Sequence, residues 1–187
     1  PKRHLLKNYM MQSNVRPNST DITIHDDFLD KEYFKKLQDH VFGLSFPWYV
    51  STAVRGDIDS NYQMCHVVYG NHAIYSEFYN ELGPLFTDLD IFVALRIKLN
   101  LLKREEKIIE HGMHIDVPNA PDNALTSILY MNTNNGYTKF ETGEKVKSVE
   151  NRLVTFNNNL IHTGSTNNCD AINRCVMNID WIKKENT

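Results

Sequence analysis

The spacing of hydrophobic residues changes from helical to strand-like near residue 91. Earlier in the chain, hydrophobic residues recur every three or four positions over residues 31–41, which predicts a helix with one buried face. That face is formed by Phe34, Leu37 and Val41. Asp30 stands where an N-cap is expected for this helix. A second helix is predicted over residues 74–86, bent or interrupted at Gly83-Pro84 because proline breaks helices.

Residues 91–102 form a long β-rich run in which polar and hydrophobic residues alternate toward its end. Successive side chains of a strand point to opposite faces, so this run predicts one polar and one apolar face. The more polar face holds Arg96, Lys98, Asn100 and Leu102. The other face holds Ile97, Leu99 and Leu101.

Short strand-like segments follow, separated by turns rich in asparagine and glycine. They cover residues 108–117, 125–132, 138–141, 144–149, 152–156, 160–165 and 172–182. Regular short strands preceded by two helices predict a mainly β (α+β) fold, with a jelly-roll or barrel-like double sheet and the helices on one outer face. We expect residues 21–187 to form one domain with a core over about residues 91–182. Residues 1–20 are expected to form an N-terminal arm.

The composition is that of an ordinary globular protein, with 187 residues of which 41% are hydrophobic and 23% charged. A net charge of −3 gives no global electrostatic reason to bind nucleic acid or an anionic membrane. Three cysteines, an odd number without metal-site spacing, favour a reducing compartment over a disulfide framework. Without an apolar run of membrane-spanning length or a signal-peptide core, the chain is expected to be soluble and cytoplasmic.

One pattern of residues indicates metal chemistry. His114 and Asp116 are two positions apart in a predicted strand, so their side chains share a face, and His162 begins a later strand. Two imidazoles and one carboxylate are the ligand set of the facial triad, which holds non-haem Fe(II) and leaves coordination positions open. Arg174 in the last predicted strand supplies a guanidinium suited to a carboxylate co-substrate. The plain alternative is that these are ordinary surface residues.

Two other histidines are not predicted to be metal ligands. His111 precedes His114 by three residues, so it faces the opposite side of a regular strand, although a β-bulge would reverse this. His66 lies in a predicted strand over residues 63–69 without a partner ligand at a matching spacing. It is therefore expected to be a core or hydrogen-bonded histidine.

The second half of the chain resembles the double-stranded β-helix (cupin-like) core of the Fe(II)- and 2-oxoglutarate-dependent oxygenase superfamily, and it is most similar to small prolyl-hydroxylase-like members. The matching segments are 114–116 (HID), 127–132 (SILYMN), 136–140 (GYTKF), 152–156 (RLVTF), 162–164 (HTG) and Arg174. The resemblance implies that Fe(II) is bound by His114, Asp116 and His162. It also implies that Arg174 pairs with the far carboxylate of 2-oxoglutarate, that the Tyr130 hydroxyl donates to the same carboxylate, and that O2 is a co-substrate.

The sequence departs from this family in two places. Many prolyl hydroxylases carry a tyrosine-proline pair near the end of the first core strand, where this chain has Leu102-Lys103. Asn100, on the same face as Leu102, is the predicted replacement contact to the co-substrate. The segment that begins at Gly136 has one glycine where relatives often have two.

The resemblance implies a dioxygenase that hydroxylates a C–H bond of a protein or peptide side chain, with proline as the first candidate. One alternative keeps the chemistry but acts on a free small molecule or a nucleobase, and few basic residues near the site weigh against nucleic acid. A further alternative is a non-enzymatic metal-binding jelly roll or a structural zinc site. Arg174 and Tyr130 argue against it, because a structural zinc site has no use for a carboxylate clamp.

Overall fold

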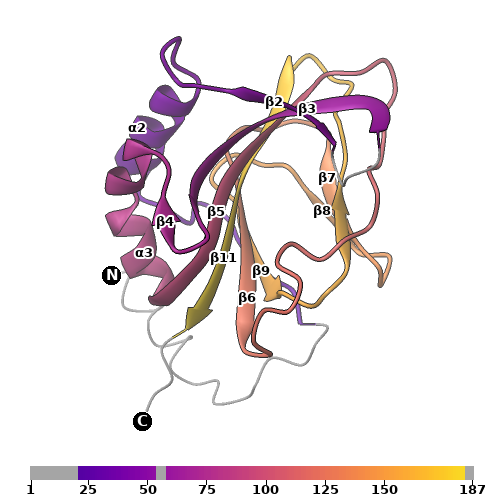
Figure 1. Cartoon of the computed structure of the whole chain (residues 1–187). Helices are drawn as coiled ribbons and strands as arrows, with labels where there is room; N and C mark the ends of the chain where they lie inside the picture. The colour runs from indigo at the N-terminus through magenta and orange to yellow at the C-terminus, as the bar shows by residue number, and fades with distance from the viewer. Residues whose placement is uncertain (1–20, 54–57, 184–187) are drawn as a thin grey trace.

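The computed structural model describes residues 21–53 and 58–183 and consists mainly of antiparallel strands in two sheets (Figure 1). The predicted arm over residues 1–20 lies outside the described residues. Hydrogen bonds order the larger sheet as β1-β9-β6-β11-β5-β3-β2, with β4 paired to β3. Its strands are β1 (Thr23–His25), β2 (Tyr49–Ala53), β3 (Ile58–Gly70), β4 (Ala73–Ile74), β5 (Ile91–Lys103), β6 (Ala124–Tyr130), β9 (Leu153–Asn157) and β11 (Asn173–Lys183).

The smaller sheet has the order β10-β7-β8. Its strands are β7 (Tyr137–Phe140), β8 (Lys145–Lys147) and β10 (His162–Gly164). Figure 1 places β7 and β8 on the opposite side of the larger sheet from the two helices. This arrangement confirms the predicted jelly-roll fold, and six of the seven segments predicted after residue 102 contain a strand.

The predicted first helix is confirmed as α2 (Lys31–Val41). One carboxylate oxygen of Asp30 accepts hydrogen bonds from the backbone N–H groups of Glu32 and Tyr33, at 3.1 and 3.2 Å. These bonds satisfy two of the amide groups that a helix leaves free in its first turn. The three hydrophobic residues predicted to face the core are buried.

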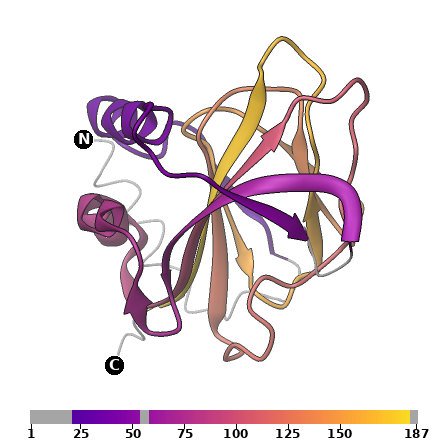
Figure 2. The same cartoon turned by 45° about the horizontal axis from the view of Figure 1, so that its top comes forward.

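The predicted helix over residues 74–86 is instead two short helices. A 3₁₀ helix, η1 (Glu77–Glu81), is followed by α3 (Gly83–Leu89), which has Pro84 in its first turn. Proline has no amide hydrogen and is favoured at the start of a helix, so it begins α3 and separates it from η1. Figures 1 and 2 show α2 and α3 on the same outer side of the larger sheet.

The alternation predicted for β5 divides the hydrophobic core from a polar cavity. Ile97 and Leu99 are fully buried in the cluster that joins the helices to the larger sheet. Side chains on the opposite face of β5 line the cavity between the two sheets, so they share a face as predicted. These are Arg96, Lys98, Asn100 and Leu102. For Arg96 and Lys98 the favoured prediction was a solvated position, and it is wrong because both line the cavity. His66 is buried too, and its Nδ1 lies 2.7 Å from the Pro47 carbonyl oxygen, which confirms a hydrogen-bonded core histidine.

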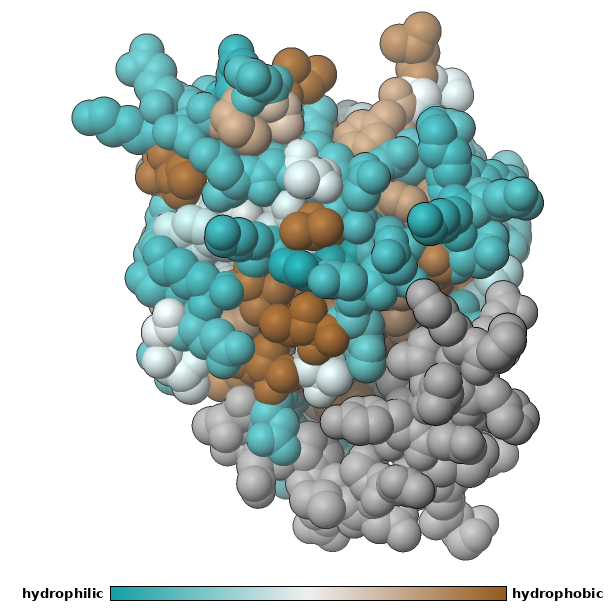
Figure 3. Space-filling view, turned by 180° about the vertical axis from the view of Figure 1, so that it is seen from behind, coloured by the Kyte–Doolittle hydropathy of each residue, from teal (hydrophilic) through white to brown (hydrophobic). Residues whose placement is uncertain are grey.

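Hydrophilic residues dominate the rear surface, with a group of hydrophobic residues near its centre (Figure 3). Among the described residues, no helix combines the length and apolar character that crossing a membrane requires.

Candidate active site

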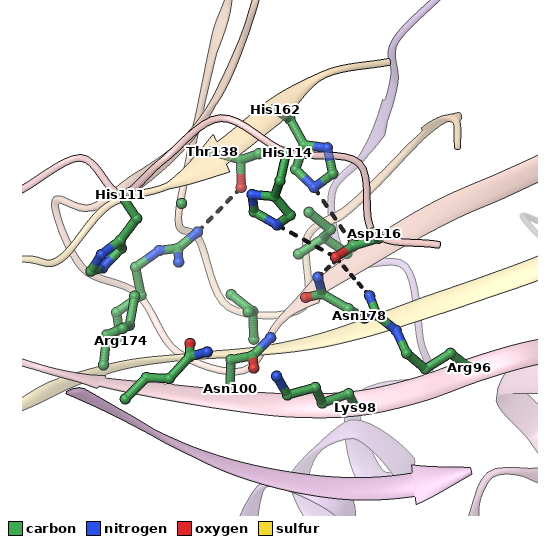
Figure 4. A pocket seen from close by; sticks show the side chains of 15 residues that line it. Arg96, Lys98, Asn100, His111, His114, Asp116, Thr138, His162, Arg174 and Asn178 are labelled. Atoms are coloured by element: carbon green, nitrogen blue, oxygen red, sulfur yellow. Dashed lines mark hydrogen bonds and ion pairs between the residues drawn. The ribbon is translucent and has the colours of Figure 1, made fainter. Parts of the chain in front are cut away.

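The cavity between the two sheets has a volume of about 130 Å³. It receives side chains from β3, β5, β6 and β11 of the larger sheet, from β7 and β10 of the smaller sheet, and from the segment 111–116 that precedes β6. Figure 4 shows His114, His162, Asn178 and Arg96 pointing toward Asp116, with Arg174 and His111 on another side of the cavity. Residues far apart in the sequence thus meet in one polar space.

The three predicted metal ligands meet at one end of this space. One donor atom from each of His114, Asp116 and His162 lies within 4.8 Å of the others. The Nε2 atoms of both histidines are 3.5 Å from the two carboxylate oxygens of Asp116, one histidine to each oxygen. The two imidazole rings have their centroids 4.9 Å apart.

Hydrogen bonds at the far side of each ring leave Nε2 free to bind a metal. His114 Nδ1 lies 3.0 Å from the Gly112 carbonyl oxygen, and His162 Nδ1 lies 3.1 Å from that of Leu160. A carbonyl only accepts, so both Nδ1 atoms carry a hydrogen, and in the neutral imidazole that a metal ion binds each Nε2 then keeps its lone pair. His162 Nε2 is buried and has no hydrogen-bond partner among the described residues. An unpaired acceptor facing a carboxylate fits a divalent metal ion between them.

Asp116 is held in place by a buried network across β5 and β11. Arg96 pairs with one of its oxygens at 2.6 Å, and Asn178 donates to the other at 2.8 Å. Arg96 in turn pairs with the fully buried Asp180 at 2.9 Å, and Asp180 accepts from the Thr126 hydroxyl at 2.8 Å. The network orients the carboxylate of this predicted ligand without using the histidines.

The network and the burial shift the acid–base properties of these groups. Burial raises the pKa of Asp180 to about 6, with the nearby charge of Asp116 acting in the same direction. Burial would also raise the pKa of Asp116, but the adjacent imidazoles of His114 and His162 and the charge of Arg96 hold that pKa well below its usual range. Asp116 is therefore a carboxylate at neutral pH, as metal binding requires.

The segment that carries the first two predicted ligands is not the regular strand predicted over residues 108–117. It forms two isolated bridges, Glu110 with Ser165 just after β10 and His114 with His162 in β10, and the His111 N–H donates to the Gly164 carbonyl oxygen between them. Three residues lie between the two bridge positions on this segment, but only two lie between their partners His162 and Ser165, so the segment carries one extra residue. Such a bulge reverses the side-chain alternation.

The extra residue explains the position of His111. The prediction that it faces away from the site is wrong, because His111 lines the cavity (Figure 4). His111 is not part of the three-residue donor cluster. The backbones of His114 and His162 exchange both N–H···O bonds, at 2.8 and 3.0 Å, which fixes the two histidines side by side despite the irregular segment.

Arg174 lies in the same cavity with only 2% of its surface exposed. Its Nε donates to the Ser148 hydroxyl at 2.8 Å and its Nη2 to the Thr138 hydroxyl at 3.2 Å. No described carboxylate pairs with it, and burial lowers its pKa without removing its charge. A buried cation without a counter-ion is costly, so this position is suited to an anionic ligand.

Tyr130 and Asn100 occupy different positions relative to the cavity. The Tyr130 side chain is fully buried behind the lining, and its hydroxyl donates to the Thr138 hydroxyl at 2.8 Å. Its ring centroid lies 5.6 Å from the guanidinium carbon of Arg174. Direct contact of Tyr130 with the co-substrate stays a prediction. Asn100 lines the cavity, and its buried carboxamide oxygen has no described partner.

Sequence reasoning missed Thr138 and Ser148, which hold Arg174, and the network through Arg96 and Asp180. Threonine and serine are too common to stand out in one sequence. A signal was available for Arg96, because it shares a strand face with the other cavity residues of β5.

Neither a protein-family model nor a curated protein sequence matches the chain, whereas solved structures do match. A prolyl hydroxylase from Trichoplax adhaerens, in complex with a peptide fragment of the oxygen degradation domain of hypoxia inducible factor, is similar with a TM-score of 0.68 and 15% identity, covering 97% of this chain and 90% of that one. An oxidoreductase of the 2OG-Fe(II) oxygenase family from Burkholderia pseudomallei has a TM-score of 0.63 and 14% identity, with 97% and 92% covered.

The non-heme alpha-ketoglutarate-dependent epimerase SnoN from nogalamycin biosynthesis is also similar, with a TM-score of 0.65 and 10% identity, covering 96% of this chain and 81% of that one. Identities this low establish a shared fold and leave the reaction open. The chain therefore has the fold of the 2-oxoglutarate- and iron(II)-dependent oxygenases, and the resemblance seen in the sequence is confirmed at the level of the fold.

Proposed function

We propose that this protein is an Fe(II)- and 2-oxoglutarate-dependent dioxygenase that hydroxylates a C–H bond. The observation that carries the proposal is the presence, in one cavity, of the His-Asp-His cluster and a buried guanidinium without an acidic partner among the described residues. A metal ion alone accounts for the cluster but adds another positive charge beside Arg174. A dicarboxylate that reaches from the metal to Arg174 satisfies both groups.

Each residue then has a distinct task. The Nδ1 hydrogen bonds hold the two histidine rings with Nε2 toward the metal, and Arg96 and Asn178 orient the Asp116 carboxylate. Fe(II), with 2-oxoglutarate and dioxygen, would supply the oxidising chemistry that converts a substrate C–H bond to C–OH. The protein contributes ligand geometry, a fixed anchor for the co-substrate and a space that limits water.

Thr138 is the proposed hydroxyl contact beside Arg174. Its oxygen accepts hydrogen bonds from both Tyr130 and Arg174, so its own hydrogen is free to donate to a carboxylate. In this arrangement Tyr130 supports the co-substrate site from behind, and Asn100 remains a candidate contact from β5. The site thereby offers a charged fork and a neutral donor to the far carboxylate.

We assign the substrate to a protein or peptide side chain, with proline as the first candidate. The assignment is supported by the likeness to a prolyl hydroxylase solved with a peptide. The same reaction on a free small molecule or a nucleobase is the alternative. A metal-binding protein without activity is a further alternative, and Arg174 weighs against it.

The test measures succinate release from 2-oxoglutarate with and without added Fe(II), using proline-containing peptides and free amino acids, with mass spectrometry to detect one added oxygen. Fe(II)-dependent succinate release is expected, and its absence with Fe(II) present would leave only the metal-binding alternative. Products carrying the oxygen distinguish peptides from free small molecules.

Arg174→Ala is expected to weaken 2-oxoglutarate binding about 100-fold or more, because an unpaired buried charge costs roughly 3–5 kcal/mol. Arg174→Lys should recover part of this loss, since it keeps the charge but not the fork. Arg104→Ala removes an exposed arginine outside the cavity lining and serves as the control. Unchanged co-substrate affinity in Arg174→Ala would refute the role of Arg174.

A further inference from the structure

A second cation in the cavity, Lys98, has no part in the chemistry described so far. Its side chain comes from the cavity face of β5 and is half-buried. No hydrogen bond or ion pair joins its ammonium group to any described residue, and burial lowers its pKa. A partly desolvated ammonium group in a ligand cavity is suited to an anion.

Strand register separates Lys98 from the proposed co-substrate anchor. On β11, Arg174 pairs with Leu102 of β5, whereas Asn178 pairs with Lys98. Four residues along an antiparallel strand correspond to about 13–14 Å. Asn178 also donates to Asp116, so Lys98 projects from the level of the metal ligands and not from that of Arg174. Figure 4 shows Lys98 below Asp116, with Arg174 on another side of the cluster.

The charges of the site leave Lys98 without a counterpart even after metal and co-substrate are considered. Arg96 is balanced by the buried Asp180. The two charges of a divalent metal and that of Arg174 are balanced by Asp116 and the two carboxylates of 2-oxoglutarate. The remaining positive charge is that of Lys98, so a ligand that carries one more negative charge would neutralise the cavity.

Two carboxamide oxygens near Lys98 lack hydrogen-bond donors among the described residues, so a ligand in this part of the cavity should also supply N–H groups. Asn178 is 7% exposed, and its amide nitrogen is committed to Asp116, which leaves its oxygen buried without a described partner. Asn100, two residues after Lys98 on the same face of β5, also has a buried oxygen without a described partner. A ligand that satisfies all three groups carries a negative charge together with N–H donors.

We propose that Lys98 binds a carboxylate of the primary substrate, and that this substrate is a peptide with an acidic residue beside the hydroxylated one. The inference rests on the proposed function for the identity of the reaction, but the binding preference can be tested without turnover. A free amino acid offers the same carboxylate and N–H chemistry and is the other possible source.

The experiment uses the full chain loaded with Mn(II) under anaerobic conditions, with and without 2-oxoglutarate. The probes are short capped peptides, Gly-Asp-Pro-Gly and Gly-Pro-Asp-Gly, their Asn counterparts, and free L-aspartate. Binding near the metal is read from the paramagnetic relaxation of the probe protons. At least one Asp peptide is expected to bind about ten-fold or more tightly than its Asn counterpart, because the amide lacks the charge.

Lys98→Gln is expected to abolish this difference, and Lys98→Glu to favour a matching Lys peptide over the Asp peptide. Lys107→Gln removes an exposed lysine outside the cavity lining and should retain the preference for Asp. Free L-aspartate binding as tightly as the peptide would support carboxylate recognition and assign its source to a free amino acid.

The proposal is overturned by equal binding of the Asp and Asn peptides, by a difference that persists in Lys98→Gln, or by no binding of any probe. It is also overturned if Lys98→Gln loses 2-oxoglutarate affinity and keeps the preference for Asp. Failure of the unmodified protein to bind 2-oxoglutarate contradicts the proposed function instead, and the titrations without 2-oxoglutarate still decide the role of Lys98.

Discussion

The position of Arg174 depends on the absence of a side chain at Gly136. A Cβ atom added there would lie 2.7 Å from the Arg174 Cδ and 2.8 Å from the Thr166 carbonyl oxygen. Both contacts are too short, and the backbone oxygen cannot move aside cheaply. Gly136→Ala is therefore expected to displace Arg174 and to weaken 2-oxoglutarate binding about ten-fold or more, as measured by titration of the Mn(II)-loaded protein.

Mn(II) affinity without co-substrate should change much less in Gly136→Ala, because the three atoms nearest to the added Cβ belong to Arg174, Thr166 and Asn134 and not to the predicted metal ligands. Gly83→Ala is the matched control, since a Cβ at Gly83 meets nothing within 4 Å. Equal loss of metal and co-substrate binding would mean that the substitution disturbs the whole cavity.

At the scale of single residues, the sequence predicted the groups whose chemistry is rare. A histidine, an aspartate and a second histidine at strand-compatible positions, followed by an arginine in an apolar strand, are recognisable by type. The side chains that hold them are not. Thr138 and Ser148 gain their roles from the register of β7 and from the loop after β8, which places them against Arg174. No local pattern encodes that placement.

Among the elements, the segment 108–117 shows where periodicity fails. It was predicted as a strand, but one extra residue between its bridges to Ser165 and His162 makes it irregular. A segment without regular strand pairing needs side-chain contacts to hold His114 and Asp116 in place. Glu110 provides them by accepting hydrogen bonds from Tyr137 and Lys139, each at 2.7 Å, and from Lys145 at 3.1 Å.

These bonds, that of Lys139 first, lower the pKa of Glu110 to about 2. Because the folded pKa lies below the ordinary value of 4.5, the stabilisation is complete above pH 4.5 and is lost as the pH falls toward 2. Glu110→Gln is expected to reduce the free energy of unfolding by about 1 kcal/mol at pH 7, a modest value because these side chains are solvent-screened.

Urea unfolding of the unmodified protein and of Glu110→Gln at pH 7, 5 and 3 measures this loss of unfolding free energy. The difference between them should be similar at pH 7 and 5 and smaller at pH 3. A difference that does not depend on pH would show that the Glu110 charge is not responsible for it.

The pairing of β5 with β11 places Asp180 opposite Arg96. Asp180 therefore holds the Arg96 guanidinium, and Arg96 in turn holds Asp116. Asp180→Asn keeps the shape but removes the charge that balances Arg96. Arg96 would then bind Asp116 more strongly and compete with the metal for it. We expect Mn(II) affinity to fall about 10–100-fold, which is typical for the loss of a group that orients a metal ligand.

Asp170→Asn removes an exposed carboxylate and is the control for charge. Mn(II) titrations of Asp180→Asn and Asp170→Asn at the same pH compare their metal affinities directly. Wild-type affinity in Asp180→Asn would mean that Asn178 alone orients Asp116.

Across the whole molecule, the alternation of β5 and the boundaries of α2 and β11 were predictable because each follows from local periodicity. The division into two sheets was predictable only as a class of fold. It arises from pairings between strands distant in sequence, such as β1 with β9 and β5 with β11, which a single sequence does not encode locally.

The division into two sheets has a consequence for stability. His162 belongs to the smaller sheet and His114 bridges to it, whereas Arg174 belongs to the larger sheet. A metal with 2-oxoglutarate therefore ties the two sheets together, while the metal alone engages one end of the cavity. Each ligand present at about 100 times its Kd stabilises the fold by about 2.7 kcal/mol, or roughly 5–10 °C in Tm for a domain of this size.

Thermal unfolding with EDTA, with Mn(II), and with Mn(II) plus 2-oxoglutarate should thus show two successive increases in Tm. 2-Oxoglutarate with EDTA should raise Tm by far less, because the dicarboxylate then lacks its metal contact. Arg174→Ala should keep the increase caused by Mn(II) and lose most of the second, whereas His114→Ala should lose most of both. An equal increase from 2-oxoglutarate with and without metal would contradict a bridging co-substrate, since it would mean that Arg174 binds the anion independently of the His-Asp-His cluster.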